Sequence, residues 1–69
     1  MKYYIIKGCI RDGEHEYSQT MVCRRKSLNP KIASKLFIDH FSVHDYRILF
    51  VDYFHEITKE EYQTLKKYL

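Results

Sequence analysis

The chain has 69 residues, of which 45% are hydrophobic and 30% are charged, with only two glycines and one proline. This length and composition predict one folded domain over residues 1–69 and exclude a disordered chain. The net charge of +3 permits nucleic acid or an acidic protein patch as a partner, and it argues against an acidic mimic of DNA.

The hydropathy pattern gives no indication of a membrane segment. No apolar run reaches the ~18 residues of a membrane-spanning helix, and no basic-then-apolar signal segment opens the chain. We therefore expect a cytoplasmic protein with no membrane partner. In that compartment Cys9 and Cys23 would be free thiols.

The first two predicted elements form a β-hairpin. Residues 2–11 are rich in aromatic and β-branched side chains, residues 15–25 form the return strand, and Asp12-Gly13 is a typical hairpin turn. With Asp12-Gly13 as the two-residue loop, Tyr4 faces Met21 and Gly8 leaves room for the ring of Tyr17. In that register the two cysteines lie on opposite faces of the hairpin, which disfavours a disulfide.

A helix is predicted over residues 30–41. Asn29 can cap it, and Pro30 fits the first helical position, where a missing N–H costs nothing. Its apolar stripe has helical spacing and consists of Ile32, Ala33, Leu36, Phe37, His40 and Phe41.

A third strand is predicted over residues 46–54, with two alternating faces. The bulkier face is expected to contact the helix and contains Tyr46, Ile48, Phe50 and Phe54. The other face contains Arg47, Leu49, Val51 and Tyr53. Asp52 interrupts the first set, and a β-bulge at this residue could change the phase.

The last predicted element is a helix over residues 58–69. Thr58 and Glu61 have the spacing of a capping box, and Ile57 and Tyr62 are placed for a hydrophobic staple. The complete order β-β-α-β-α predicts an α+β fold with a three-stranded antiparallel sheet of order 2-1-3. The long helix covers one face of that sheet.

The sheet face opposite the long helix is the predicted partner-binding surface. It consists of Tyr3, Ile5, Lys7, Val22, Leu49, Val51 and Tyr53. An exposed apolar patch of this kind usually marks a partner or a self-association surface, so a homodimer through this face is one expectation. The alternative is that the second helix covers this face and makes it a second core. A basic patch borders the surface and consists of Arg24, Arg25, Lys26, Lys31, Lys35 and Arg47.

Two other classes of function remain as alternatives. Rings and cations interleaved on an open sheet also fit an RNA- or single-strand-binding module, although no ring-Gly-ring segment of the RNP type is present. The run His44-Asp45-Tyr46-Arg47 has residue types used by small RNA-cleaving toxins, but its alternation points His44 and Arg47 to opposite faces. The histidines and cysteines lack the spacing of a zinc site, so neither a metal nor a cofactor is expected.

Parts of the chain resemble a known group of small proteins. The opening Tyr4-Ile5-Ile6-Lys7, the Ser27-Leu28 entry to a helix with Lys31-Ile32-Ala33-Ser34-Lys35, and the strand at Tyr46-Arg47-Ile48 are similar in layout to short proteins of phages and mobile elements. In particular, they resemble one small inhibitor family directed at type I CRISPR surveillance complexes. The similarity covers roughly the first fifty residues and departs in the C-terminal helix.

This resemblance implies a non-enzymatic protein that binds a nucleoprotein complex and blocks its access to DNA. The cations Arg24, Arg25, Lys26, Lys31 and Lys35 would then contact an acidic or phosphate-bearing patch. Together, the residues and the resemblance predict a small binding protein without catalytic activity that acts as a modulator or inhibitor of a protein partner or nucleoprotein complex.

Overall fold

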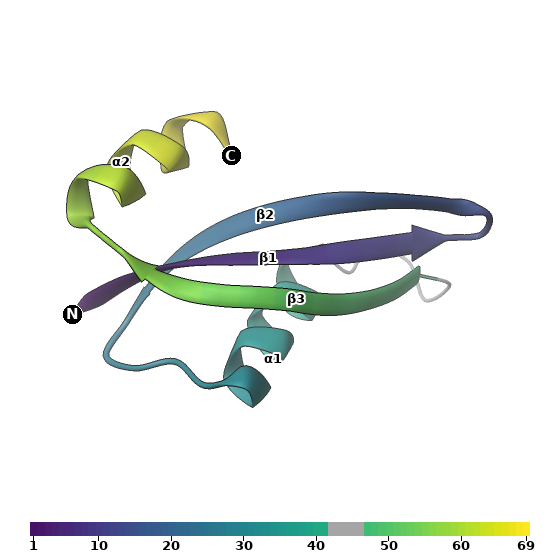
Figure 1. The fold of residues 1–69 in the computed structure, drawn as a ribbon, viewed down its shortest axis with the longest axis horizontal. Coiled ribbons are helices and arrows are strands. Elements are labelled where there is room, and N and C mark those ends of the chain that lie inside the picture. The colour runs from purple at the N-terminus through teal and green to yellow at the C-terminus, as the bar shows by residue number, and fades with distance from the viewer. Residues whose placement is uncertain (42–46) are drawn as a thin grey trace.

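The computed structural model describes residues 1–41 and 47–69, which form three strands and two helices. Their order is β1 (Lys2–Asp12), β2 (His15–Arg25), α1 (Pro30–Phe41), β3 (Arg47–Ile57) and α2 (Lys59–Tyr68). The strands form one antiparallel sheet in the order β2-β1-β3, with β1 in the centre (Figure 1). The predicted α+β fold, element order and strand order are confirmed.

The hairpin between β1 and β2 has a different register from the predicted one. Asp12 pairs with His15, so the two-residue loop is Gly13-Glu14. A type I′ loop at Asp12-Gly13 would need positive φ at both residues, whereas only Gly13 has a positive φ, of 65°. Glycine therefore takes the first loop position, as in a type II′ turn, and the register moves by two residues. Because the shift is an even number, every side chain keeps its predicted face.

Helix α1 packs on one face of the sheet and closes the core. The buried core cluster combines residues from β1, β2 and α1, namely Ile6, Ile10, Met21, Ala33 and Phe37. The helix begins where the sequence predicts, because the Ile32 N–H donates to Asn29 Oδ1 at 2.8 Å. His40, which the spacing places in the apolar stripe, is exposed. Its ring lies edge-on to the Phe41 ring, with the ring centroids 4.7 Å apart.

Gly8 is a point of close approach between α1 and the sheet. A Cβ at this position would lie 2.6 Å from the Phe37 Cζ atom and 2.5 Å from the Phe50 carbonyl oxygen. The Phe37 ring therefore occupies the space next to Gly8, and the prediction that this space holds the Tyr17 ring is wrong. In the observed register Tyr17 lies opposite Ile10.

A β-bulge at Asp52 sets the phase of β3. Gly8 pairs with Val51 and Lys7 pairs with Tyr53, so Asp52 is the extra residue. Leu49, Val51 and Phe54 consequently pack against the core. The predicted helix-facing set is thus correct for Phe54 and wrong for Ile48 and Phe50, which are exposed. Tyr46 lies outside the described residues, and the strand continues to Ile57 rather than ending at residue 54.

Helix α2 lies on the face opposite α1, at the end of the sheet where the chain begins (Figure 1). Its capping box is formed as predicted: the Glu61 N–H donates to Thr58 Oγ1 at 3.1 Å, and the Thr58 N–H donates to Glu61 Oε1 at 3.0 Å. No residue of α2 is buried. Within residues 1–41 and 47–69, neither helix has the length and apolar character needed to span a bilayer.

Replacing Gly8 tests the contact between α1 and the sheet. Gly8→Ala is expected to lower the free energy of unfolding by about 1–3 kcal/mol, because the new methyl group overlaps the Phe37 ring and the β3 backbone. Urea unfolding measures this cost. In a Phe37→Leu background the same change should cost less, since the ring atoms are gone. An equal cost in both backgrounds would mean that the ring is not the obstacle.

Removing the α2 cap should loosen this helix alone. Thr58→Ala removes a cap that contributes about 1 kcal/mol to helix stability, and faster amide exchange is expected across α2 with little change in the core strands. Thr64→Ala, in the same helix, is the matched control. The hydrogen bond from the Thr58 backbone lowers the pKa of Glu61. This part of the cap should therefore be present above the usual Glu pKa and be lost as pH falls through the lowered value. Equal exchange rates in the two variants would contradict this role of the cap.

Candidate partner-binding surface

The bulge at Asp52 turns three large apolar side chains of β3 away from α1. In the sheet register Ile48 lies beside Arg11, Phe50 beside Cys9 and Tyr53 beside Lys7. Their exposed fractions are 57% for Ile48, 41% for Phe50 and 48% for Tyr53. These three side chains, called here the β3 patch, lie on an edge strand of the sheet.

The predicted binding face is partly correct. Tyr3, Ile5, Lys7, Val22 and Tyr53 lie on the face opposite α1, as the strand alternation predicts. Leu49 and Val51 do not, because they pack against the core under α1. The prediction placed β3 in the opposite phase before the bulge, so it missed Ile48 and Phe50. The acidic Asp52 inside an apolar run was the signal that could have located them.

Helix α2 covers one end of this face and leaves the other end open. The Tyr62 ring lies 4.8 Å from the Tyr3 ring, and Ile5 and Val22 nearby are half-buried. The β3 patch is paired with the half of β1 that runs toward the hairpin, away from Tyr3. The face is therefore neither fully open nor a sealed second core.

Two stacked aromatic rings lie at the edge of the β3 patch. The rings of Tyr53 and His55 are stacked, with centroids 5.8 Å apart and planes within 7° of parallel. Both side chains are exposed. Rigid rings with few rotatable bonds lose little entropy on binding, which makes such surfaces effective protein contacts.

Cys9 lies in the centre of this face and is held as a thiol. Its Sγ donates to Glu16 Oε1 at 3.1 Å, and Arg11 Nη2 donates to Glu16 Oε2 at 3.1 Å. The hydrogen bond to Glu16 raises the pKa of Cys9, and burial raises it further. The same hydrogen bond lowers the pKa of Glu16. A protonated thiol is a weak nucleophile, so the raised pKa of Cys9 does not favour a nucleophilic role for this side chain.

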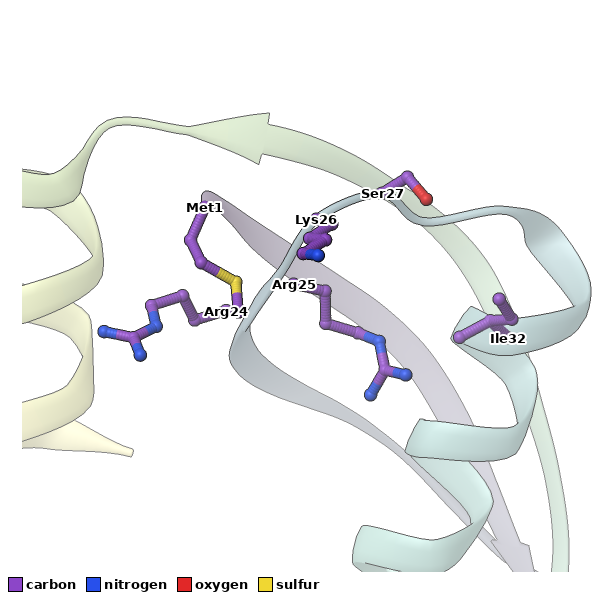
Figure 2. Close-up of a pocket in the computed structure, with 6 residues that line it drawn as sticks. All are labelled: Met1, Arg24, Arg25, Lys26, Ser27 and Ile32. Carbon is purple, nitrogen blue, oxygen red and sulfur yellow. The ribbon is translucent and has the colours of Figure 1, made fainter.

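The predicted basic patch is divided among several directions. Arg24, Arg25 and Lys26 are exposed and line an open pocket of about 390 Å³ with Met1, Ser27 and Ile32 (Figure 2). In Figure 2 the guanidinium of Arg24 points toward α2, whereas that of Arg25 points away from it. Lys31 and Lys35 are exposed on α1. The side chain of Arg47 lies outside the described part of the chain.

The catalytic alternative falls largely outside the described residues, since His44, Asp45 and Tyr46 are not among them. In the described ranges, no group of three or more His, Cys, Asp and Glu side chains is placed to hold a metal ion. Cys9 and Cys23 are both free thiols. They lie on opposite faces of the hairpin, with Cys23 packed against the core.

Comparison with known proteins adds no assignment. The chain matches no protein-family model, no curated protein and no solved structure.

The state of Cys9 can be checked by alkylation. In a Cys23→Ser background, Glu16→Ala is expected to move the pH midpoint of the reaction with iodoacetamide to a lower value, because the hydrogen bond that raises the pKa of Cys9 is gone. Glu14→Ala, in the adjacent loop, is the control. An unchanged midpoint in the Glu16 variant would contradict the role assigned to this hydrogen bond.

Proposed function

We propose that this protein acts by binding a protein partner through the β3 patch, as a modulator or inhibitor without catalytic activity of its own. The observation that carries the proposal is the exposure of Ile48, Phe50 and Tyr53 side by side on one edge strand. A half-exposed aromatic side chain offers on the order of 100 Å² of contact area. Water contact at such a cluster is unfavourable, and a partner surface would remove it.

The chemistry of the patch favours an apolar partner surface. Large apolar and aromatic side chains that become fully desolvated carry most of the binding energy at protein interfaces. Lys7 borders the patch on the neighbouring strand, and it would favour a partner with acidic groups around its apolar contact. The resemblance to inhibitors of type I CRISPR surveillance complexes is part of the proposal: the partner would be a nucleoprotein assembly in the cytoplasm, and the protein would come from a phage or mobile element.

The proposal can be tested by comparing two variants that each lose two exposed apolar side chains. Phe50→Ser with Tyr53→Ser removes the two rings of the patch, and Ile38→Ser with Tyr68→Ser removes two exposed apolar side chains elsewhere. Tagged proteins would be used to capture partners from the native host, with half of each sample treated with nuclease. We expect the affinity of the first variant for the partner to fall by roughly tenfold or more, and the second variant to retain the partner.

Three results would bear on this proposal. Retention of the partner by the Phe50 and Tyr53 variant would overturn it. Loss of all captured protein after nuclease treatment would also overturn it, because the contact would then be to nucleic acid. If light scattering shows a dimer that the same variant dissociates, the occupant of the patch is a second copy of the chain, and the separate-partner proposal is wrong.

Salt dependence distinguishes the two classes of contact. Affinity that depends on apolar burial should change little between 50 mM and 200 mM salt, whereas a contact with 6–10 phosphates would lose about 10³–10⁵ in affinity. A steep loss for the captured complex would argue against the β3 patch as its main contact. The Ile38 and Tyr68 control variant should show the same salt profile as the unaltered protein.

A further inference from the structure

A second candidate site lies between α2 and the end of the sheet. Side chains from β1, β2 and α2 line an open cleft of about 440 Å³, namely Tyr3, Arg24, Lys59, Tyr62, Gln63 and Lys66. Four of these belong to α2, which the resemblance described above does not include. The cleft shares no residue with the β3 patch.

The cleft is strongly cationic. Arg24, Lys59 and Lys66 are three of its six lining residues, and no carboxylate lines it. The ion pairs in the described ranges join Lys2 to Glu56 and Arg11 to Glu16, so none of the three cations belongs to one. Their combined field therefore favours an anionic ligand.

Two of the lysines of α2 lie on the helix face that lines the cleft. Lys59, Gln63 and Lys66 have the i, i+4, i+7 spacing of one helix face and line the cleft. The acidic Glu60 and Glu61 instead line a different surface hollow, together with Thr64 and Leu65. The carboxylates of α2 therefore line a different hollow from Lys59 and Lys66.

Aromatic rings accompany the cations. Tyr3 and Tyr62 line the cleft and contact each other, with centroids 4.8 Å apart and planes at 43°. Lys66 Nζ lies 5.5 Å from the centre of the Tyr62 ring. Cations along a groove with aromatic rings among them are the combination that binds single-stranded nucleic acid, where cations meet phosphates and rings stack on bases.

The cationic surface extends over two adjoining hollows, which is more than a single phosphate would occupy. Arg24 also lines the neighbouring pocket of about 390 Å³, which adds Arg25 and Lys26 (Figure 2). In Figure 2 Arg24 points toward α2 and so connects the two hollows. A ligand with repeated anionic groups matches this shape better than a single phosphate does. We propose that the α2 cleft binds the phosphate backbone of a short single-stranded RNA or DNA segment.

The test uses variants with matched changes of charge. Arg24→Gln with Lys66→Gln removes two cations from the cleft, and Lys31→Gln with Lys35→Gln removes two exposed cations from α1. Fluorescence anisotropy of labelled oligouridylate and oligodeoxythymidylate gives the affinity and its salt slope. We expect the cleft variant to bind roughly tenfold more weakly and its salt slope to be smaller by about 1.4, from about 0.7 per lost phosphate contact. The α1 variant should lose less than about twofold.

A second pair of variants leaves the number of cations unchanged. Gln63→Glu puts a carboxylate into the cleft, and Thr64→Glu puts the same group on the other side of α2. Only the first should weaken binding. Because both residues are exposed on the helix, helical circular dichroism should be equal in the two proteins.

Clear results would overturn the inference. If the cleft and α1 variants lost equal affinity, or if the Gln63 and Thr64 variants did, the oligonucleotide would be attracted only by the net charge of the protein. Equally strong binding of heparin or duplex DNA would lead to the same conclusion, since neither offers unpaired bases to the rings. Failure of this test leaves the β3 patch untouched, because the two sites have no residue in common.

Discussion

The contact of the Phe37 ring with the backbone of Gly8 is the constraint on which the rest of the molecule depends. A Cβ at residue 8 would meet the Phe37 ring on one side and the Phe50 carbonyl oxygen on the other. The missing side chain lets α1 lie close to the central strand. The β-bulge of β3 falls at the same level, between the partners of Lys7 and Gly8. Helix position and strand phase are therefore linked at one residue.

The strand phase in turn decides which apolar side chains face water. Without the extra residue at Asp52, one uninterrupted alternation would put Phe54 on the same face as Phe50 and Ile48. With the bulge, Leu49, Val51 and Phe54 all enter the core, and Ile48, Phe50 and Tyr53 all leave it. The side chains of the β3 patch are therefore exposed because the alternating residues of β3 pack in the core.

Local sequence patterns predicted the helices and strands, whereas the hairpin register and the phase of β3 depend on contacts between strands. The capping box at Thr58, the Asn29 cap and the strand order follow from short-range chemistry and chain-connection rules, and all three are present. The hairpin register depended on which loop residue takes positive φ, which Asp12-Gly13 alone does not determine. The face of Leu49 and Val51 depended on the bulge at Asp52, which the sequence raised as an alternative but which only the pairing of β3 with β1 establishes.

The candidate sites were harder to predict than the fold, for the same reason. Arg24 and Lys66 are 42 positions apart in the sequence, and they line one cleft because β2 ends beside α2. Sequence reasoning grouped Arg24 with its neighbours Arg25 and Lys26, although adjacent strand residues point to opposite faces. Contiguity along the chain therefore identified Arg24, Arg25 and Lys26, which line one pocket, but missed Lys59 and Lys66, which line the cleft with Arg24.

The character of α2 is better explained by ligand contact than by core formation. A helix that buries none of its residues adds little hydrophobic stabilisation to the fold. It is held by its own capping box and by the ring contact of Tyr62 with Tyr3. Its sequence also puts Lys59 and Lys66 on the face that lines the cleft, whereas Glu60 and Glu61 line a different hollow. This placement of two lysines is what an anion-binding wall beside Arg24 requires.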